Sequence, residues 1–264
     1  PRKGEPGSVT QTNFSIRDVE SILELVEQND DTMILASCGY MLEPIKHALR
    51  DAGIPFENRY RRKRGDWNPL YASRGMSAAN KLLAFLRPVP EAWLHEARLW
   101  TPTEILAWSG MIKTSGLFQQ GFKQTLEKLP PEQPIPSLGD IFTPEGAGRF
   151  LARSEKDSLD IYEACLGAKA PSMEFPLRVA RRYGSAALRD EPMVQIGTVH
   201  SVKGGEASTV ILAPDLSPQA MDQWHEGGKG HDAVRRCFYL GMTRARENIV
   251  LLSPSGTRSV EWDR

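Results

Sequence analysis

The sequence has few cysteines and no long apolar run. Its three cysteines, Cys38, Cys165 and Cys237, are widely scattered, and none belongs to a CxxC pair. An odd, scattered set argues against a disulfide framework and a zinc site, and it indicates a reducing compartment. No run approaches the roughly 20 apolar residues that cross a bilayer, and no signal peptide is recognised. We therefore expect a cytoplasmic protein with free thiols and no membrane partner.

The sequence also lacks net charge and a phosphate-binding loop. Lys plus Arg and Asp plus Glu each number 33, so any attraction to nucleic acid must come from local patches. No segment fits the Gly-x-x-x-x-Gly-Lys-Ser/Thr pattern of the usual nucleotide-binding loop. The chain starts at Pro1 without an initiator Met, which suggests a fragment or a processed product. Motifs that this sequence lacks are then expected upstream of Pro1.

What is present is the composition of a soluble globular protein, with 40% apolar and 25% charged residues in a chain of 264. Residues 1–15 are polar and read as a loose lead-in, and 16–30 have the apolar spacing of a helix. The apolar run at 32–38 predicts a buried strand, the next residues a helix closed by Gly53, and 54–61 a returning strand. Together these segments predict a βαβ unit.

The middle of the chain is predicted to be helical. A helix at 77–88 stops at Pro88, and a Pro-rich connector occupies 129–140 without a convincing strand around it. The expected helices of this insertion cover 91–98, 103–113, 116–128, 157–168 and 175–188.

Strand patterns return at 193–199 and at 208–215. A loop rich in Gly and His (222–232) precedes a helix that runs directly into a last strand at 248–252. Alternating strands and helices indicate a parallel α/β sheet interrupted by a helical insertion. The predicted boundaries place the first part of the sheet domain at 1–88, the helical insertion at 89–189 and the remainder of the sheet domain at 190–264.

Polar residues that could bind an anion follow one strand and precede another. His200, Lys203 and Glu206 follow the strand that ends near Val199, and Gly204 and Gly205 would let the backbone approach a ligand. Singly, a Lys-Gly-Gly is more often a turn, and a lone His more often a hydrogen-bonded loop residue.

Two arginines, Arg244 and Arg246, end the last predicted helix. A Lys and an Arg aimed at one site suit a triphosphate, although an Arg at a helix end usually complements the helix dipole. In open α/β sheets ligands bind beyond the carboxyl ends of the strands, and both polar groups are predicted near that edge.

Three segments, in order, resemble motifs of UvrD/Rep-type superfamily-1 helicases. "GTVHSVKGGEASTVIL" is similar to the fifth motif, Thr-x-His-x-x-Lys-Gly-Leu-Glu before an apolar strand, and "RRCFYLGMTRARENIVLL" to the sixth. "MILASCGYMLEPIKHALRDAGIPFE" resembles the fourth, and 77–88 the helix after it. The resemblance covers about residues 32–88 and 190–253, whereas the insertion matches only in position and helical character.

The resemblance implies the second of two RecA-like domains, with ATP bound between them. The first domain would carry the phosphate loop and the acid that binds Mg²⁺. Arg244 would be the arginine finger, Lys203 and Gly204 would lie near the same phosphate, and Glu206 would bond the ribose. The residues that would touch single-stranded DNA are Thr198, His200 and Ser201. Arg246, beside the finger, is more often structural.

Some positions depart from the family pattern or lie outside it. Gly205 replaces the usual Leu, Ser37, Cys38 and Gly39 stand where the fourth motif has an Arg, and the insertion is shorter. The basic run at 59–64, followed by Trp67, could bind a nucleic-acid backbone or be a solvated strand end. The aromatic residues of the insertion are expected to form its core; they include Trp93, Trp100, Trp108 and Phe118.

The first hypothesis is the C-terminal half of an ATP-dependent DNA helicase or translocase, inactive as an ATPase without its N-terminal RecA-like domain. The alternative is a non-catalytic RecA-like module that binds nucleic acid or a protein. Retention of Lys203, Glu206 and Arg244 together favours the motor. A small-molecule α/β enzyme lacks support, because no nucleophile–base pair or metal cluster stands out. A role in DNA repair is a family-level expectation only.

Overall fold

The structure is a computed structural model that describes residues 7–61, 65–72, 74–86, 100–135, 137–150, 154–168, 171–202 and 204–262. The chain forms two compact units. One contains the chain up to Pro69 together with Glu191–Arg264, and the other is Leu70–Asp190. The segment 77–88, which the sequence analysis grouped with the first part of the sheet, lies in the second unit.

The first unit is built on a six-stranded sheet in which every pairing is parallel. The strand order is β1-β6-β5-β2-β4-β3, so the central strand β2 pairs with two strands that come about 160 to 180 residues later in the chain. The strands are β1 (Ser8–Ser15), β2 (Thr32–Ala36), β3 (Phe56–Glu57), β4 (Val194–Thr198), β5 (Ala207–Leu212) and β6 (Ala245–Ser253). A parallel sheet flanked by helices confirms the predicted RecA-like α/β fold.

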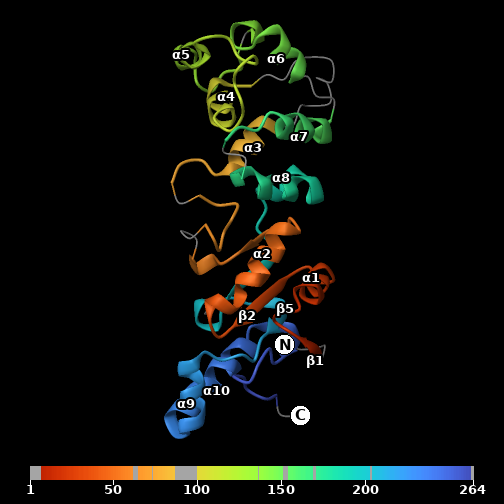
Figure 1. The fold of residues 1–264 in the computed structure, drawn as a ribbon, viewed down its shortest axis with the longest axis vertical. Helices are drawn as coiled ribbons and strands as arrows, with labels where there is room; N and C mark the ends of the chain where they lie inside the picture. The colour runs from red at the N-terminus through yellow and green to blue at the C-terminus, as the bar shows by residue number, and fades with distance from the viewer. Residues whose placement is uncertain are drawn as a thin grey trace. The chain divides into compact units, whose positions relative to one another are not determined.

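Helices cover both faces of this sheet (Figure 1). Along β2, Ile34 packs in one buried cluster with α1 (Val19–Glu27) and α2 (Glu43–Asp51). Its neighbour Leu35 packs in the opposite cluster with α10 (Gly228–Met242). Successive side chains of a strand point to opposite faces, and a strand buried on both faces therefore reads as the continuous apolar run seen in the sequence.

The predicted loose lead-in is wrong, because residues 8–15 form β1 along the edge of the sheet. β1 pairs with β6, with Val9 level with Ile249. Its side chains are mostly exposed, and Val9 is 69% exposed. An edge strand that is solvated on both faces has no apolar alternation, so its partner, distant in the sequence, determines its structure.

The predicted Gly/His loop at 222–232 is also wrong. Helix α9 (Pro218–Glu226) is capped by Ser217, whose hydroxyl accepts a hydrogen bond from the backbone N–H of Ala220 (3.2 Å), and Gly227 (φ 75°) separates α9 from α10. The last helix therefore starts at Gly228 and ends at Met242. Arg244 lies in the turn after it, and Arg246 belongs to β6 rather than to the helix end.

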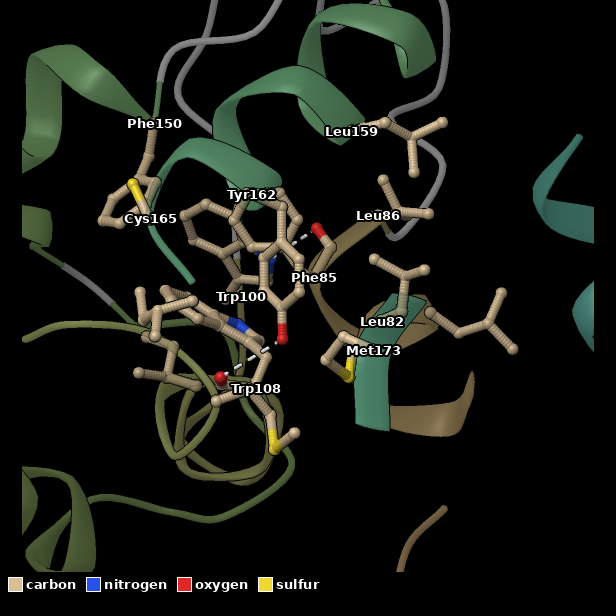
Figure 2. Close-up of a cluster of buried hydrophobic side chains, with 14 of the residues drawn as sticks. Leu82, Phe85, Leu86, Trp100, Trp108, Phe150, Leu159, Tyr162, Cys165 and Met173 are labelled. Atoms are coloured by element: carbon tan, nitrogen blue, oxygen red, sulfur yellow. Dashed lines mark hydrogen bonds between the residues drawn. The ribbon is translucent and has the colours of Figure 1, made fainter. Parts of the chain in front are cut away.

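The second unit is helical and packs around an aromatic core (Figure 2). Trp100 donates a hydrogen bond from Nε1 to the carbonyl of Phe85 (3.2 Å), and Tyr162 donates one to the carbonyl of Trp108 (3.4 Å). The predicted helix at 91–98 and Trp93 lie outside the described residues. The helices are α3 (Ala78–Leu86), α4 (Pro102–Ser109), α5 (Phe122–Lys128), α6 (Pro144–Arg149), α7 (Glu155–Ala164) and α8 (Pro171–Tyr183).

All three cysteines are free: Cys165 is buried in the helical unit, and Cys38 and Cys237 are half-buried in the sheet unit. Burial raises the pKa of the Cys237 thiol, and the nearby Cys38 adds to that shift. Among the described helices, none is both long and apolar enough to span a bilayer.

Candidate nucleotide and nucleic-acid interface

A tight turn closes the carboxyl end of β4 and carries three of the predicted site residues. Thr198 is the last residue of β4, and its hydroxyl accepts a hydrogen bond from the backbone N–H of Ser201 (3.2 Å). The Ser201 hydroxyl donates to the carbonyl of Thr198 (2.9 Å). His200, between them, is exposed. The structure thus brings Thr198, His200 and Ser201 together in one short turn, with the imidazole facing solvent.

The buried side chain of Asn58 supports this turn through hydrogen bonds. Its Nδ2 donates to the carbonyl of Ile196 (2.9 Å) and to the Ser201 hydroxyl (3.1 Å), and the residue is 1% exposed. Gly197 leaves the space for this contact, because a Cβ built there would lie 2.6 Å from Nδ2 of Asn58. Sequence analysis did not find Asn58, and no local signal marks it, because its partners lie far along the chain.

The predicted phosphate-contact segment crosses from one edge of the sheet to the other. Thr198 ends β4, whereas Glu206 directly precedes β5, and parallel strands run in the same direction. Gly204 has φ 89°, in the region that favours glycine, and Glu206 is exposed. Lys203 lies outside the described residues. The expectation that both polar groups share the carboxyl edge is therefore wrong: Glu206 lies at the amino edge.

Arg244 lies at the same amino edge and joins the two motifs. Its Nη1 donates to the carbonyl of Gly205 (3.2 Å) and its Nε to the carbonyl of Leu240 (3.1 Å). The carbonyl of Arg244 accepts a hydrogen bond from the backbone N–H of Ala207 (3.0 Å). Its Nη2 donates to the Thr243 hydroxyl (3.2 Å). Within the described residues, no carboxylate forms an ion pair with Arg244.

Arg246, two residues later, has a different environment. Its guanidinium forms an ion pair with Asp31 and donates a hydrogen bond to the Ser208 hydroxyl (2.9 Å). Asp31 also accepts a hydrogen bond from the backbone N–H of Ser208 (3.0 Å). Arg246 thus fastens the start of β6 to the residue before β2, which agrees with the structural role expected of it.

The first residues of the basic run are tied to the fold. Arg59 pairs with Glu57 (2.8 Å) and Glu191 (3.0 Å). The guanidinium of Arg61 lies 4.9 Å from the ring centre of Trp67. Residues 62–64 lie outside the described part of the chain, so their binding to a nucleic-acid backbone stays a prediction.

The fold and the site of the described residues together indicate the class of domain. A parallel sheet has an uncompensated arginine at its amino edge and a hydroxyl-rich turn at its carboxyl edge, an arrangement that suits a RecA-like domain. In the described part of the chain, no group of three or more His, Cys, Asp or Glu side chains is placed to hold a metal ion.

Comparison with known families then identifies the segment. Residues 182–255 match the family model of the UvrD-like helicase C-terminal domain. This match confirms the resemblance over the fifth and sixth motifs, and it contains every predicted site residue from Thr198 to Arg244. No curated protein matches the chain. The matched segment does not include 32–88, where the fourth motif remains a prediction.

Proposed function

We propose that the chain is the finger-bearing half of an ATP-dependent DNA helicase or translocase. The observation that carries this proposal is the contact between Arg244 and the carbonyl of Gly205, which joins the fifth and sixth motifs at the amino edge of the sheet. In this proposal one edge of the domain meets nucleotide and the opposite edge meets single-stranded DNA. The segment from Thr198 to Glu206 connects these two edges.

The amino edge fits a phosphate anion. Within the described residues, the side-chain hydrogen bonds of Arg244 go to neutral oxygens, so its positive charge is available to an incoming anion. ATP would supply the γ-phosphoryl group, and the partner RecA-like domain would hold the phosphates and Mg²⁺. Arg244 would then stabilise the charge that develops on the transferred group. Lys203 and Gly204 would lie near that group, and the exposed Glu206 carboxylate would accept a hydrogen bond from a ribose hydroxyl.

The carboxyl edge would carry the single-stranded DNA. His200 is exposed and has a flat ring on which a base can stack, and Thr198 and Ser201 are its neighbours in the same turn. Because one continuous segment links Glu206 to His200 and Asn58 supports its start, a shift at Glu206 or Gly205 would be passed along this segment to His200. Closing and opening of the two RecA-like domains would in this way move the strand.

The test is the single-strand-stimulated ATPase of the native protein that carries this chain with its N-terminal RecA-like domain. Arg244→Ala should lower kcat by a factor of about 10³ to 10⁵. Arg246→Ala is the matched control: it removes the neighbouring guanidinium, which is paired with Asp31, and should leave kcat within about threefold. Wild-type turnover in Arg244→Ala would exclude the finger role.

Two further outcomes separate this proposal from a binding module. The isolated chain should show no ATPase of its own, and steady hydrolysis by it would contradict dependence on a partner domain. Single-strand binding without any ATPase in the native protein would assign the chain as a non-catalytic module.

A further inference from the structure

An exposed aromatic side chain lies beside the proposed single-strand contact, outside the three motif segments. Tyr60 is 53% exposed and belongs to the 3-10 helix η2 (Arg59–Arg61), which follows the edge strand β3. β3 pairs in parallel with β4, so η2 lies at the same carboxyl edge as Thr198, the last residue of β4. η2 also packs against the turn at Val199–Val202, which carries His200. Two exposed aromatic rings therefore come from neighbouring segments.

The backbone that carries Tyr60 is held by two buried asparagines. The backbone N–H of Tyr60 donates to Oδ1 of Asn58 (3.1 Å), and Nδ2 of the same Asn58 donates to the Ser201 hydroxyl (3.1 Å). The carbonyl of Arg61 accepts a hydrogen bond from Nδ2 of Asn68 (2.8 Å). Asn58 and Asn68 are 1% and 4% exposed. One buried side chain thus fixes both Tyr60 and the turn, so a ligand meets them as one pre-organised surface.

The side chain of Tyr60 extends toward the segment that follows the turn. A Cβ built on Gly204 would lie 3.5 Å from the Tyr60 hydroxyl oxygen, so the outer end of the ring lies beside Gly204. Within the described residues, this hydroxyl has no hydrogen-bond partner, and no aromatic ring or cation stacks on the Tyr60 ring. An exposed aromatic face that no protein group covers is a surface on which a nucleic-acid base can stack.

The two arginines of η2 differ in their charge environment. Arg59 forms ion pairs with Glu57 (2.8 Å) and Glu191 (3.0 Å), which compensate its charge. The guanidinium of Arg61 lies 4.9 Å from the ring centre of Trp67, which is 3% exposed, and it forms no ion pair with a carboxylate of the described residues. Arg61 therefore has a fixed position and a positive charge that can attract a phosphate.

We propose that Tyr60 is a second base-stacking residue beside His200, and that Arg61 contacts a phosphate of the same strand. Neighbouring strands lie about 4.8 Å apart, so the ends of β4 and β3 are roughly one to two nucleotides apart along a single strand. The stacking is independent of sequence, because every base has a flat face. The inference rests on the proposed single-strand contact and extends it from β4 to β3.

The experiment measures the affinity of the native protein that carries this chain, without nucleotide, for two fluorescent strands of equal length. One is oligo-dT, and the other is an abasic deoxyribose-phosphate strand. Tyr60→Ala should weaken binding of oligo-dT about tenfold, as expected for one stacked base, and leave binding of the abasic strand unchanged. Tyr60→Phe keeps the ring and should bind oligo-dT like the wild type. Tyr183→Ala, which removes an exposed tyrosine beside Arg182 in the helical unit, should change neither affinity.

Arg61→Ala tests the phosphate contact separately. It should weaken binding of both strands and reduce the slope of log K against log salt by about one. Arg59→Ala is the matched control, because it removes a guanidinium that is already paired with two carboxylates, and it should leave the slope unchanged. An unchanged slope in Arg61→Ala would overturn the phosphate contact.

His200→Ala separates this inference from the proposed function on which it rests. If His200→Ala weakens binding of oligo-dT and Tyr60→Ala does not, the stacking role of Tyr60 is overturned and the proposed single-strand contact stands. An equal loss on both strands in Tyr60→Ala would also overturn stacking, because a ring that only supports the fold affects both strands alike. Absence of any single-strand binding by the wild-type protein would overturn both this inference and the proposed single-strand contact.

Discussion

The Nδ2 of Asn58 lies 3.1 Å from the hydroxyl oxygen of Ser201, 143 residues away in the sequence. Asn58 is itself held by Asn68, whose Oδ1 accepts its backbone N–H (3.0 Å). This buried pair of asparagines connects the residues after β3 to the turn that carries Thr198 and His200. The geometry of the turn therefore depends on a residue outside the helicase motifs.

Gly197→Ala tests this support directly. The added methyl would lie 2.6 Å from Asn58 Nδ2 and 2.7 Å from the Ser201 hydroxyl oxygen, so one of them must move. We expect the free energy of unfolding to fall by about 1–3 kcal/mol, and single-strand binding to weaken. Urea denaturation and fluorescence anisotropy measure the two effects. Gly65→Ala, which adds a methyl to open space, should change neither; an equal loss there would contradict the explanation.

Arg244→Lys separates charge from geometry at the proposed finger. Lysine keeps the positive charge but loses the planar group that bonds the carbonyls of Leu240 and Gly205. We expect kcat of the native protein to fall by about tenfold or more, with a loss of about 1 kcal/mol in the free energy of unfolding. Steady-state ATPase and urea denaturation report on these quantities. A lysine variant with full turnover would show that charge alone is sufficient.

Trp108 tests the aromatic core of the helical unit. It is fully buried and packs against Phe85 (5.1 Å between ring centres) and Phe150 (5.4 Å). Trp108→Ala should lower the free energy of unfolding of this unit by about 3–5 kcal/mol. Trp108→Phe should cost only about 1 kcal/mol, because the indole N–H has no hydrogen-bond partner within the described residues. Urea denaturation followed by near-UV circular dichroism measures the free energy of unfolding of both variants. Equal losses of that free energy in Trp108→Ala and Trp108→Phe would show that the indole N–H has a role.

Tyr162 makes the stability of the same unit sensitive to high pH. Burial raises the pKa of Tyr162 above its ordinary value of 10.0. The folded side chain thus keeps its proton after the unfolded one has lost it, so the free energy of unfolding falls as pH rises above about 10. Tyr162→Phe should be less stable near neutral pH, because it loses the hydrogen bond to Trp108, and the difference should narrow from roughly pH 10 to 11. Urea titrations across that range measure it; a constant gap would contradict the role of burial.

Much of the fold was predictable because its signals are local. The apolar run at 32–36 is buried on both faces, and Gly53, with φ 67°, lies just after α2 as the punctuation indicated. The segments without such signals were predicted wrongly. β1 is polar and exposed, and α9 packs only half-buried side chains against the core, so neither contains a run of buried apolar residues.

The sequence by itself determined most of the order of strands and helices after residue 32, except α6 and α9, together with the helical character of the insertion and the resemblance that the family match confirmed over 182–255. The tertiary structure alone decided which chain segments meet: Gly205 with Arg244, Asn58 with Ser201, and Tyr60 with Gly204. The physical reason is that a parallel sheet brings strand ends together according to strand order, and strand order depends on packing between distant segments rather than on any local pattern.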